Sequence, residues 1–314
     1  MILTPEILAI FILNSLFLFF GIIALILSIK IYSKWDLNST KSLQYKLEKN
    51  SYLTSTIIKF IFLIKLPLFL FFIFTLDKIS NILPGAMCAA GVVDATPYGM
   101  YLFLVKIINL YLFGFWLILD KIDVENEKLP YSKLKFGFFI IIFFLFLSEL
   151  ILETTMFLSI DPTTMVSCCG ALYSSTSASY ISILFQIDPF ILVSLFYTNF
   201  VLLIIFYFYK NSYIYAILSM IFIIIAIISL IAVFGTYIYQ LPTHHCPFCF
   251  LQKDYYYIGY LIYSTLFIGT FYGLAIPFFK NISYYKISIF FIIAYTLIVT
   301  IYPILFYLKN GVWL

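Results

Sequence analysis

The chain has 314 residues, of which 64% are hydrophobic and only 10% are charged, and its formal net charge is +4. Its mean hydropathy of +1.09 is higher than a soluble domain can hide in a core, so the composition excludes a soluble fold and predicts an all-α polytopic membrane protein. All 18 basic residues are lysine, and most stand in short loops beside apolar segments. They mark membrane topology, and no nucleic-acid partner is expected.

Apolar runs long enough to cross about 30 Å of hydrocarbon predict the membrane helices. The first run lacks a basic start and a cleavage site and is too long for a signal-peptide core, so we expect it to stay as a membrane anchor. The connections are short, and we therefore expect residues 1–314 to form a single integral membrane domain. The eight predicted helices cover residues 6–29, 54–76, 98–119, 136–158, 187–209, 213–238, 257–279 and 287–308.

The distribution of lysine between the loops predicts the orientation of the chain. Because positively charged short loops stay in the cytoplasm, we expect both termini and the loops 77–97, 159–186 and 239–256 on the outer face. We expect a bacterial inner membrane, in which this face is periplasmic. The inner loops carry twelve lysines: Lys30, Lys34, Lys41, Lys46, Lys49, Lys121, Lys128, Lys133, Lys135, Lys210, Lys280 and Lys286. The outer segments carry three: Lys78, Lys253 and Lys309.

All five cysteines fall in the three outer loops. Cysteines that only fill a core would be scattered through the helices, where a thiol behaves as a small apolar group. We therefore expect the three loops to converge into one cluster at the outer end of the helix bundle. Cys88 lies in PGAMCAAGV, Cys168 and Cys169 lie in TTMVSCCGA, and Cys246 and Cys249 lie in THHCPFCF.

The CPFC stretch is the strongest local motif. Two intervening residues bring Cys246 and Cys249 within reach of one disulfide or one metal ion. CPFC resembles the CPxC active-site pattern of thioredoxin-superfamily oxidoreductases over four residues, which implies thiol chemistry. Pro247 suits the first position of a helix, so we expect Cys246 at an N-cap. There the helix dipole and His244 or His245 would stabilise its thiolate.

The cysteine pattern favours an integral membrane thiol–disulfide oxidoreductase that exchanges electrons between an outer-face substrate and the membrane, with a quinone as a candidate acceptor. This logic is similar to that of the DsbB and vitamin K epoxide reductase families, which combine a CxxC with a further cysteine pair near the outer face of a helix bundle. The expected partners are membrane lipid and a redox or metal-carrying protein at the outer face. The candidate catalytic residues are Cys88, Cys168, Cys169, Cys246 and Cys249.

Two alternatives stay open. A protein that binds or delivers a soft metal ion at the outer face would use thiolates and imidazoles for copper or zinc, and Met87 and Met165 add thioether sulfur beside two of the cysteine loops. A transporter or a subunit of a membrane complex would need the cysteines only for structural disulfides. The candidate metal ligands are His244, His245, Cys246 and Cys249.

Ionisable residues inside the predicted helices form a second candidate site. Glu149 and Glu153 are four residues apart and share one helix face, and Lys106 lies at a similar depth. Charged groups at such depths usually face the bundle interior or a wet cavity, so we expect a Lys106–Glu149 pair. These three residues are candidates for the polar end of a quinone pocket or for a proton path, with a structural ion pair as the alternative. Lys65 lies near the middle of the second predicted helix.

Overall fold

The computed structural model describes residues 4–36, 42–126, 129–163, 165–166, 187–279 and 281–314. These residues form helices and connecting loops, and none of them lies in a β-strand. Within this part of the chain, eight helical spans are long and apolar enough to cross a membrane. The predicted all-helical membrane architecture is confirmed at this level. The placement of the termini on the outer face stays a prediction.

Seven of the spans are single helices, and the eighth is built from three consecutive segments. The single helices are α1 (Pro5–Lys34), α2 (Ser42–Ser80), α4 (Gly99–Val124), α5 (Ser132–Ser159), α7 (Pro189–Tyr209), α10 (Ile258–Phe279) and α11 (Ile282–Asn310). The composite span comprises α8 (Ser212–Ser229), a π-helix (Leu230–Phe234) and α9 (Gly235–Tyr239). The shorter elements are α3 (Ala89–Asp94) and two 3-10 helices, Cys249–Leu251 and Lys253–Tyr255.

Helix α2 begins well before the predicted start at residue 54. Its first turns contain QYKLEKN, which is too polar for a hydropathy pattern to detect. Gln44, Leu47 and Ser51 are nevertheless buried, because their spacing places them on one helix face. The charged residues between them occupy the other side of an amphipathic extension.

Polar side chains set where four of the helices begin. At each start, a side-chain oxygen accepts a backbone N–H of the first turn, which would otherwise lack a partner. Pro5 and Pro189 directly follow two of these caps, at a position where the missing N–H of proline costs nothing. The N-caps are Thr4, Asp188, Asn211 and Asn281.

The chain divides into two compact units, and each is described by itself. The first contains residues 1–84 and 92–164, and the second contains residues 85–91 and 165–314. The short segment 85–91, which carries Cys88, thus belongs to the second unit although it follows α2 in the chain. The single domain expected over residues 1–314 stays a prediction.

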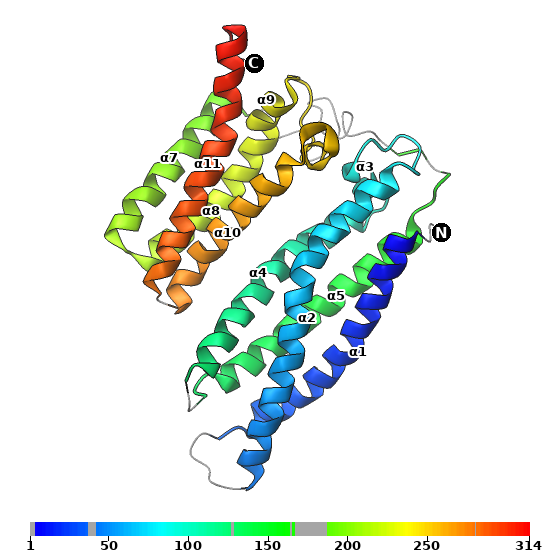
Figure 1. Ribbon diagram of the computed structural model, residues 1–314, viewed down its shortest axis with the longest axis vertical. Helices are drawn as coiled ribbons and strands as arrows, with labels where there is room; N and C mark the ends of the chain where they lie inside the picture. Colours follow the sequence, from blue (N-terminus) through cyan, green and yellow to red (C-terminus); the bar gives the residue numbers. More distant parts are fainter. Residues whose placement is uncertain (1–3, 37–41, 127–128, 164, 167–186, 280) are drawn as a thin grey trace. The chain divides into compact units, whose positions relative to one another are not determined.

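The first unit is a bundle of α1, α2, α4 and α5 (Figure 1). In it, α1 packs against α2 and α5, and α4 packs against α2 and α5. The middle of the bundle is aromatic. Phe62 stacks on Phe113 with ring centroids 4.3 Å apart and meets Trp116 edge-on. These rings are almost fully buried and fix the distance between the helices that carry the intramembrane charges.

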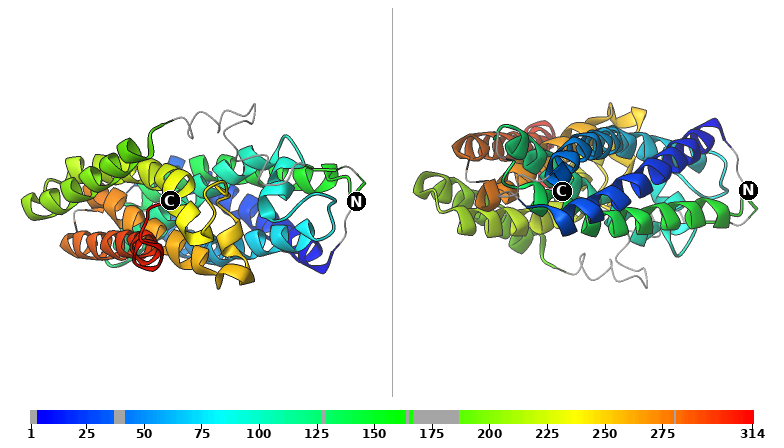
Figure 2. Two further views of the ribbon diagram at one scale, coloured as in Figure 1. Left: turned by 90° about the horizontal axis from the view of Figure 1, so that it is seen from above. Right: turned by 90° about the horizontal axis from the view of Figure 1, so that it is seen from below.

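The second unit contains α7, the composite span, α10 and α11, which lie side by side in the views of Figure 2. Helix α8 packs against α7 and α10, and α10 packs against α11. A buried hydrogen-bond chain connects three of its helices. Tyr215 donates to Ser288 Oγ over 3.0 Å, and Ser288 donates to the Gly269 carbonyl over 2.6 Å. The loop after α9 and the segment 85–91 together carry the cysteines of this unit that the structure describes.

Candidate functional site

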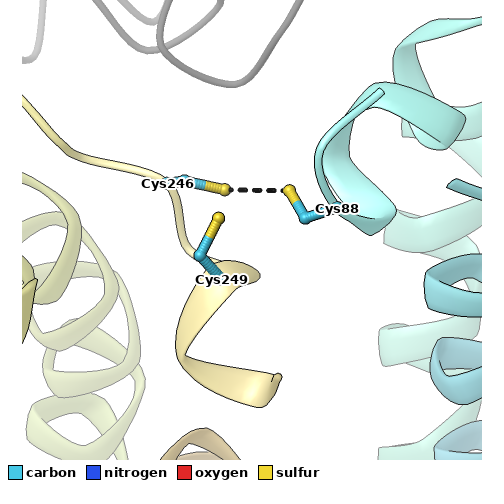
Figure 3. A group of neighbouring side chains, drawn as sticks. All are labelled: Cys88, Cys246 and Cys249. Carbon is cyan, nitrogen blue, oxygen red and sulfur yellow. Dashed lines mark hydrogen bonds between the residues drawn. The ribbon is translucent and has the colours of Figure 1, made fainter. Parts of the chain in front are cut away.

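Three cysteines of the second unit meet at one point. The sulfur atoms of Cys88, Cys246 and Cys249 all lie within 4.8 Å of one another, and Figure 3 shows them pointing toward a common centre. The Cys88 and Cys246 sulfurs are 3.4 Å apart, which is hydrogen-bond distance for thiols and far longer than a disulfide bond. The three residues are only 0%, 1% and 5% exposed. The expected convergence of the Cys88 loop and the CPFC loop is thus observed.

The spacing of these sulfurs suits a soft metal ion. A metal–sulfur bond of about 2.3 Å requires neighbouring sulfurs about 3.8–4.0 Å apart in tetrahedral or trigonal geometry. The Cys88–Cys246 distance of 3.4 Å lies just below this range, and every pair of these sulfurs lies within 4.8 Å. Small side-chain rotations would therefore bring all three sulfurs to bonding distance of one ion.

Two tyrosines hold the backbone of the CPFC loop. Tyr239, the last residue of α9, donates to the Cys246 carbonyl and accepts the Phe250 N–H over 3.1 Å. Tyr263 of α10 donates to the Pro247 carbonyl over 2.7 Å. Because Tyr239 lies on α9 and Tyr263 on α10, hydrogen bonds from two different helices hold the backbone of the loop. Neither was singled out from the sequence, since tyrosine near a membrane surface most simply indicates the headgroup region.

The predicted N-cap position of Cys246 is wrong. Pro247 opens a bend, and the next helical segment is the three-residue 3-10 helix at Cys249–Leu251, whose N-cap is Phe248. The sulfur of Cys246 instead accepts the backbone N–H of Phe248 over 3.4 Å. A thiolate at Cys246 would be stabilised by hydrogen bonds from this N–H and from the Cys88 thiol, and no helix dipole would contribute.

The Cys88 segment makes two close contacts, one with Gln252 just after the CPFC motif and one with residues 165–166. Gln252 donates from Nε2 to the Met87 carbonyl over 3.1 Å, directly beside Cys88. Upstream, Gly85 has a φ of +89°, and a Cβ at this position would collide with the Val166 carbonyl oxygen. Glycine is required there for both reasons. The turn at Gly85 therefore allows the chain at Met165 and Val166 to pack directly onto the segment that delivers Cys88.

The two histidines lie outside the group of converging sulfurs. His244 packs edge-on against Tyr239 with ring centroids 4.4 Å apart, and its Nε2 is buried without a hydrogen-bond partner in the described part of the chain. His245 Nδ1 lies 3.1 Å from the carbonyl oxygen of Ile231, which belongs to the π-helix. Burial lowers the pKa of His245. Ligation of a metal by histidine stays a prediction.

Cys168 and Cys169 lie outside the described residues. Their predicted catalytic role and the convergence of the third cysteine loop therefore stay predictions.

The intramembrane charges form a second cluster, located in the first unit. Lys106 lies 3.0 Å from carboxylate oxygens of both Glu149 and Glu153, so the expected Lys106–Glu149 pair is confirmed. Lys65 joins it through a 3.0 Å contact to the same Glu149 oxygen. All four side chains are at most 5% exposed, and their charges balance.

Two asparagines complete this cluster. Asn14 of α1 donates to Glu153 over 2.8 Å and accepts from Lys65 over 3.0 Å. Asn109 of α4 donates to Glu149 over 2.6 Å. They were missed in the sequence, although an amide inside a long apolar run is the signal that would have found them.

A cavity of about 10 Å³ beside these charges is lined by Lys65, Lys106 and Glu149 together with the apolar side chains of Leu68, Phe69, Leu110 and Phe113. It has room for about one water molecule. The predicted cofactor-binding role of Lys106, Glu149 and Glu153 stays a prediction.

The described residues therefore present a buried three-thiol group and a neutral intramembrane ion cluster, each within its own unit. No protein-family model, no curated protein and no solved structure matches the chain.

Proposed function

We propose that this membrane protein binds a soft metal ion, with Cu(I) as the preferred ion and zinc as the alternative, through the thiolates of Cys88, Cys246 and Cys249. The observation that carries the proposal is the convergence of three buried sulfurs within 4.8 Å. The group lies at the ends of membrane helices, in loops that the lysine distribution predicts on the outer face of a bacterial inner membrane.

A metal ion can bind all three sulfurs, whereas a disulfide involves only two of them. Here the third sulfur is within the same 4.8 Å of both others. Thiolate ligands select Cu(I) and zinc over hard cations. Deprotonation of the thiols accompanies binding, so metal affinity should fall as the pH is lowered.

Thiol–disulfide exchange is the second candidate, and two contacts of the Cys246 sulfur favour it. The Cys246 sulfur touches that of Cys88 and accepts the Phe248 N–H, as expected for an attacking or resolving thiolate. In this reaction Cys88 and Cys246 would form a disulfide and lose two electrons and two protons in total. A quinone in the membrane or a disulfide of an outer-face protein would accept them, and Cys168, Cys169 and Cys249 would serve as further exchange partners.

The experiment that separates the two is a Cu(I) titration of the purified full-length protein in mild detergent against a chromogenic chelator. The metal site predicts one Cu(I) per chain and a loss of affinity of tenfold or more for each of Cys88→Ser, Cys246→Ser and Cys249→Ser, because each removes one of three ligands. Cys168→Ser and Cys169→Ser show whether the third cysteine loop also contributes to Cu(I) affinity. Unchanged affinity in all three ligand variants would refute the site.

The thiol–disulfide exchange function is tested with the same protein, which is oxidised mildly in the absence of metal. A cross-link between Cys88 and Cys246 that forms rapidly, and is reduced again by a membrane quinol or a soluble dithiol, would support exchange. Protein that binds Cu(I) but forms this cross-link only slowly would leave metal binding as the function.

A further inference from the structure

The three thiols are buried, but methionines beside them are exposed. Cys88, Cys246 and Cys249 are at most 5% exposed, so a donor molecule outside the protein cannot reach their sulfurs directly. Met87, the neighbour of Cys88, is 66% exposed, and Met165 is 85% exposed. Both residues belong to the same unit as the cysteines.

The fold brings the two methionines to one place. Met165 Cγ lies 3.4 Å from the position that a Cβ on Gly85 would occupy, so the Met165 side chain rests on the turn at Gly85. Met87 is two residues beyond this turn, and its carbonyl is held by Gln252 over 3.1 Å. The thioethers therefore start from adjacent backbone at the edge of the cysteine group.

We infer that Met87 and Met165 form a thioether loading site that receives Cu(I) at the protein surface and passes it to Cys88 and then to the complete thiolate group. This inference rests on the proposed metal function and adds the route of the ion and a reason why copper is preferred to zinc. Thioether sulfur binds Cu(I) well and zinc poorly, so such a site admits copper and discriminates against zinc.

The transfer is a ligand exchange without electron transfer. Copper remains Cu(I) throughout. The bond between copper and a ligand of the donor molecule breaks as copper binds a methionine thioether. The copper–thioether bond then breaks as copper binds a cysteine thiolate. Each cysteine thiol that becomes a ligand releases its proton to the buffer. Because the thioethers are absent from the final site, they should affect the rate of loading and leave the final affinity unchanged.

The test compares the full-length protein with a variant that carries Met87→Leu and Met165→Leu. Leucine keeps the apolar volume and removes the sulfur. Met220→Leu is the matched control, because Met220 is also exposed, at 60%, and belongs to the same unit. It stands on α8, about 28 Å along the helical span from Tyr239 at 1.5 Å per residue.

Cu(I) is presented as its complex with a chromogenic chelator, and transfer is followed by stopped-flow absorbance while affinity is measured at equilibrium. We expect the double variant to load Cu(I) about tenfold more slowly, a barrier change of ~1.4 kcal/mol, with unchanged affinity. Zinc loading and the Met220→Leu control should be unaffected.

Three results would overturn the inference, and they are distinguishable. If the double variant loads Cu(I) at the normal rate and with normal affinity, the proposed loading site is refuted and the proposed metal function is unaffected. If the affinity for Cu(I) falls by as much as the loading rate, the methionines are ligands in the final site and not a transient loading site. A wild-type protein that binds no Cu(I) removes both the inference and the proposed function.

Discussion

Cys246, one of the three proposed metal ligands, is held by contacts of both its sulfur and its carbonyl. Its sulfur contacts the Cys88 sulfur and the Phe248 N–H, and its carbonyl accepts the hydroxyl of Tyr239. The same hydroxyl accepts the Phe250 N–H, so one side chain connects the backbone on both sides of the CPFC turn. The geometry of the sulfur group therefore depends on a residue that cannot itself bind a soft metal.

Replacement of Tyr239 by Phe should weaken Cu(I) binding by about 10- to 100-fold, the usual effect of removing a group that orients a metal ligand. The Phe250 N–H would also lose its buried partner, at a cost of about 1–3 kcal/mol of folding stability. Chelator competition measures the first effect and thermal unfolding the second. Tyr256→Phe is the matched control, because Tyr256 lies in the same loop and is 92% exposed. Equal effects of the two substitutions would contradict a specific role of Tyr239.

Replacement of Gly85 by Ala tests the contact that places Met165 and Val166. Alanine would be strained at a φ of +89° and would collide with the Val166 carbonyl. Gly311→Ala is a matched control, since Gly311 has a φ of +73° but nothing within 4 Å of an added Cβ. Both variants should lose about 1 kcal/mol to backbone strain. Only Gly85→Ala should lose further stability and slow Cu(I) loading, and identical melting curves for the two variants would argue against the collision.

At the level of helices, the first unit depends on one polar cluster that all four of its long helices share. Asn14 comes from α1, Lys65 from α2, Lys106 from α4, and Glu149 and Glu153 from α5. Charges buried in a membrane protein are tolerated when they are paired and hydrogen-bonded. Glu149 is central, because one of its oxygens contacts both lysines.

The substitution Glu149→Gln should destabilise the protein by about 3–5 kcal/mol, because two buried lysines would then share one remaining carboxylate. Adding Lys65→Met restores the charge balance and should recover part of the loss. Glu125→Gln is the control, since its pair with Lys121 is exposed on both sides and worth at most about 1 kcal/mol. Thermal unfolding in detergent measures all of these. If the Glu149→Gln variant has normal stability but has lost proton or electron transfer, the cluster serves as a proton path and is not a purely structural set of ion pairs.

For the whole molecule, the central prediction is the side of the membrane on which the cysteine group lies. The lysine distribution predicts both termini and the cysteine loops on the outer face. Lys135 has no part in this signal, since it is buried and paired with Asp120 and Asp123 over 3.0 Å and 2.8 Å. Without it the ratio of inner to outer lysines is eleven to three, and the predicted orientation is the same.

Single cysteines introduced into a background without native cysteines would test this orientation. Val312→Cys near the C-terminus should react with a membrane-impermeant thiol reagent applied to intact cells. Glu125→Cys, in a loop predicted to be cytoplasmic, should react only after the membrane is opened. Both positions are exposed, so accessibility on the protein itself is matched. The reverse labelling pattern would place the cysteine group in the cytoplasm.

Much of the fold could be predicted from the sequence because lipid burial leaves long apolar runs, and these gave all eight spans. Hydropathy could not detect the polar start of α2, the short helix α3 or the π-helix, whose formation depends on packing and local backbone geometry. The meeting of Cys88 with Cys246 could be predicted because the lysine distribution assigns their loops to the same face of the membrane. The positions of Tyr239 and Gln252, in contrast, depend on contacts between distant segments, and Pro247 alone was insufficient to start a helix at Cys246.

The most direct measurement of the metal site is X-ray absorption at the copper edge of the Cu(I)-loaded full-length protein. We predict a first coordination shell of three sulfur atoms at about 2.3 Å. In the Cys88→Ser protein, the number of sulfur ligands should fall to two. A shell dominated by nitrogen or oxygen, or a sulfur shell that is the same in the Cys88→Ser protein, would contradict a metal site built from Cys88, Cys246 and Cys249.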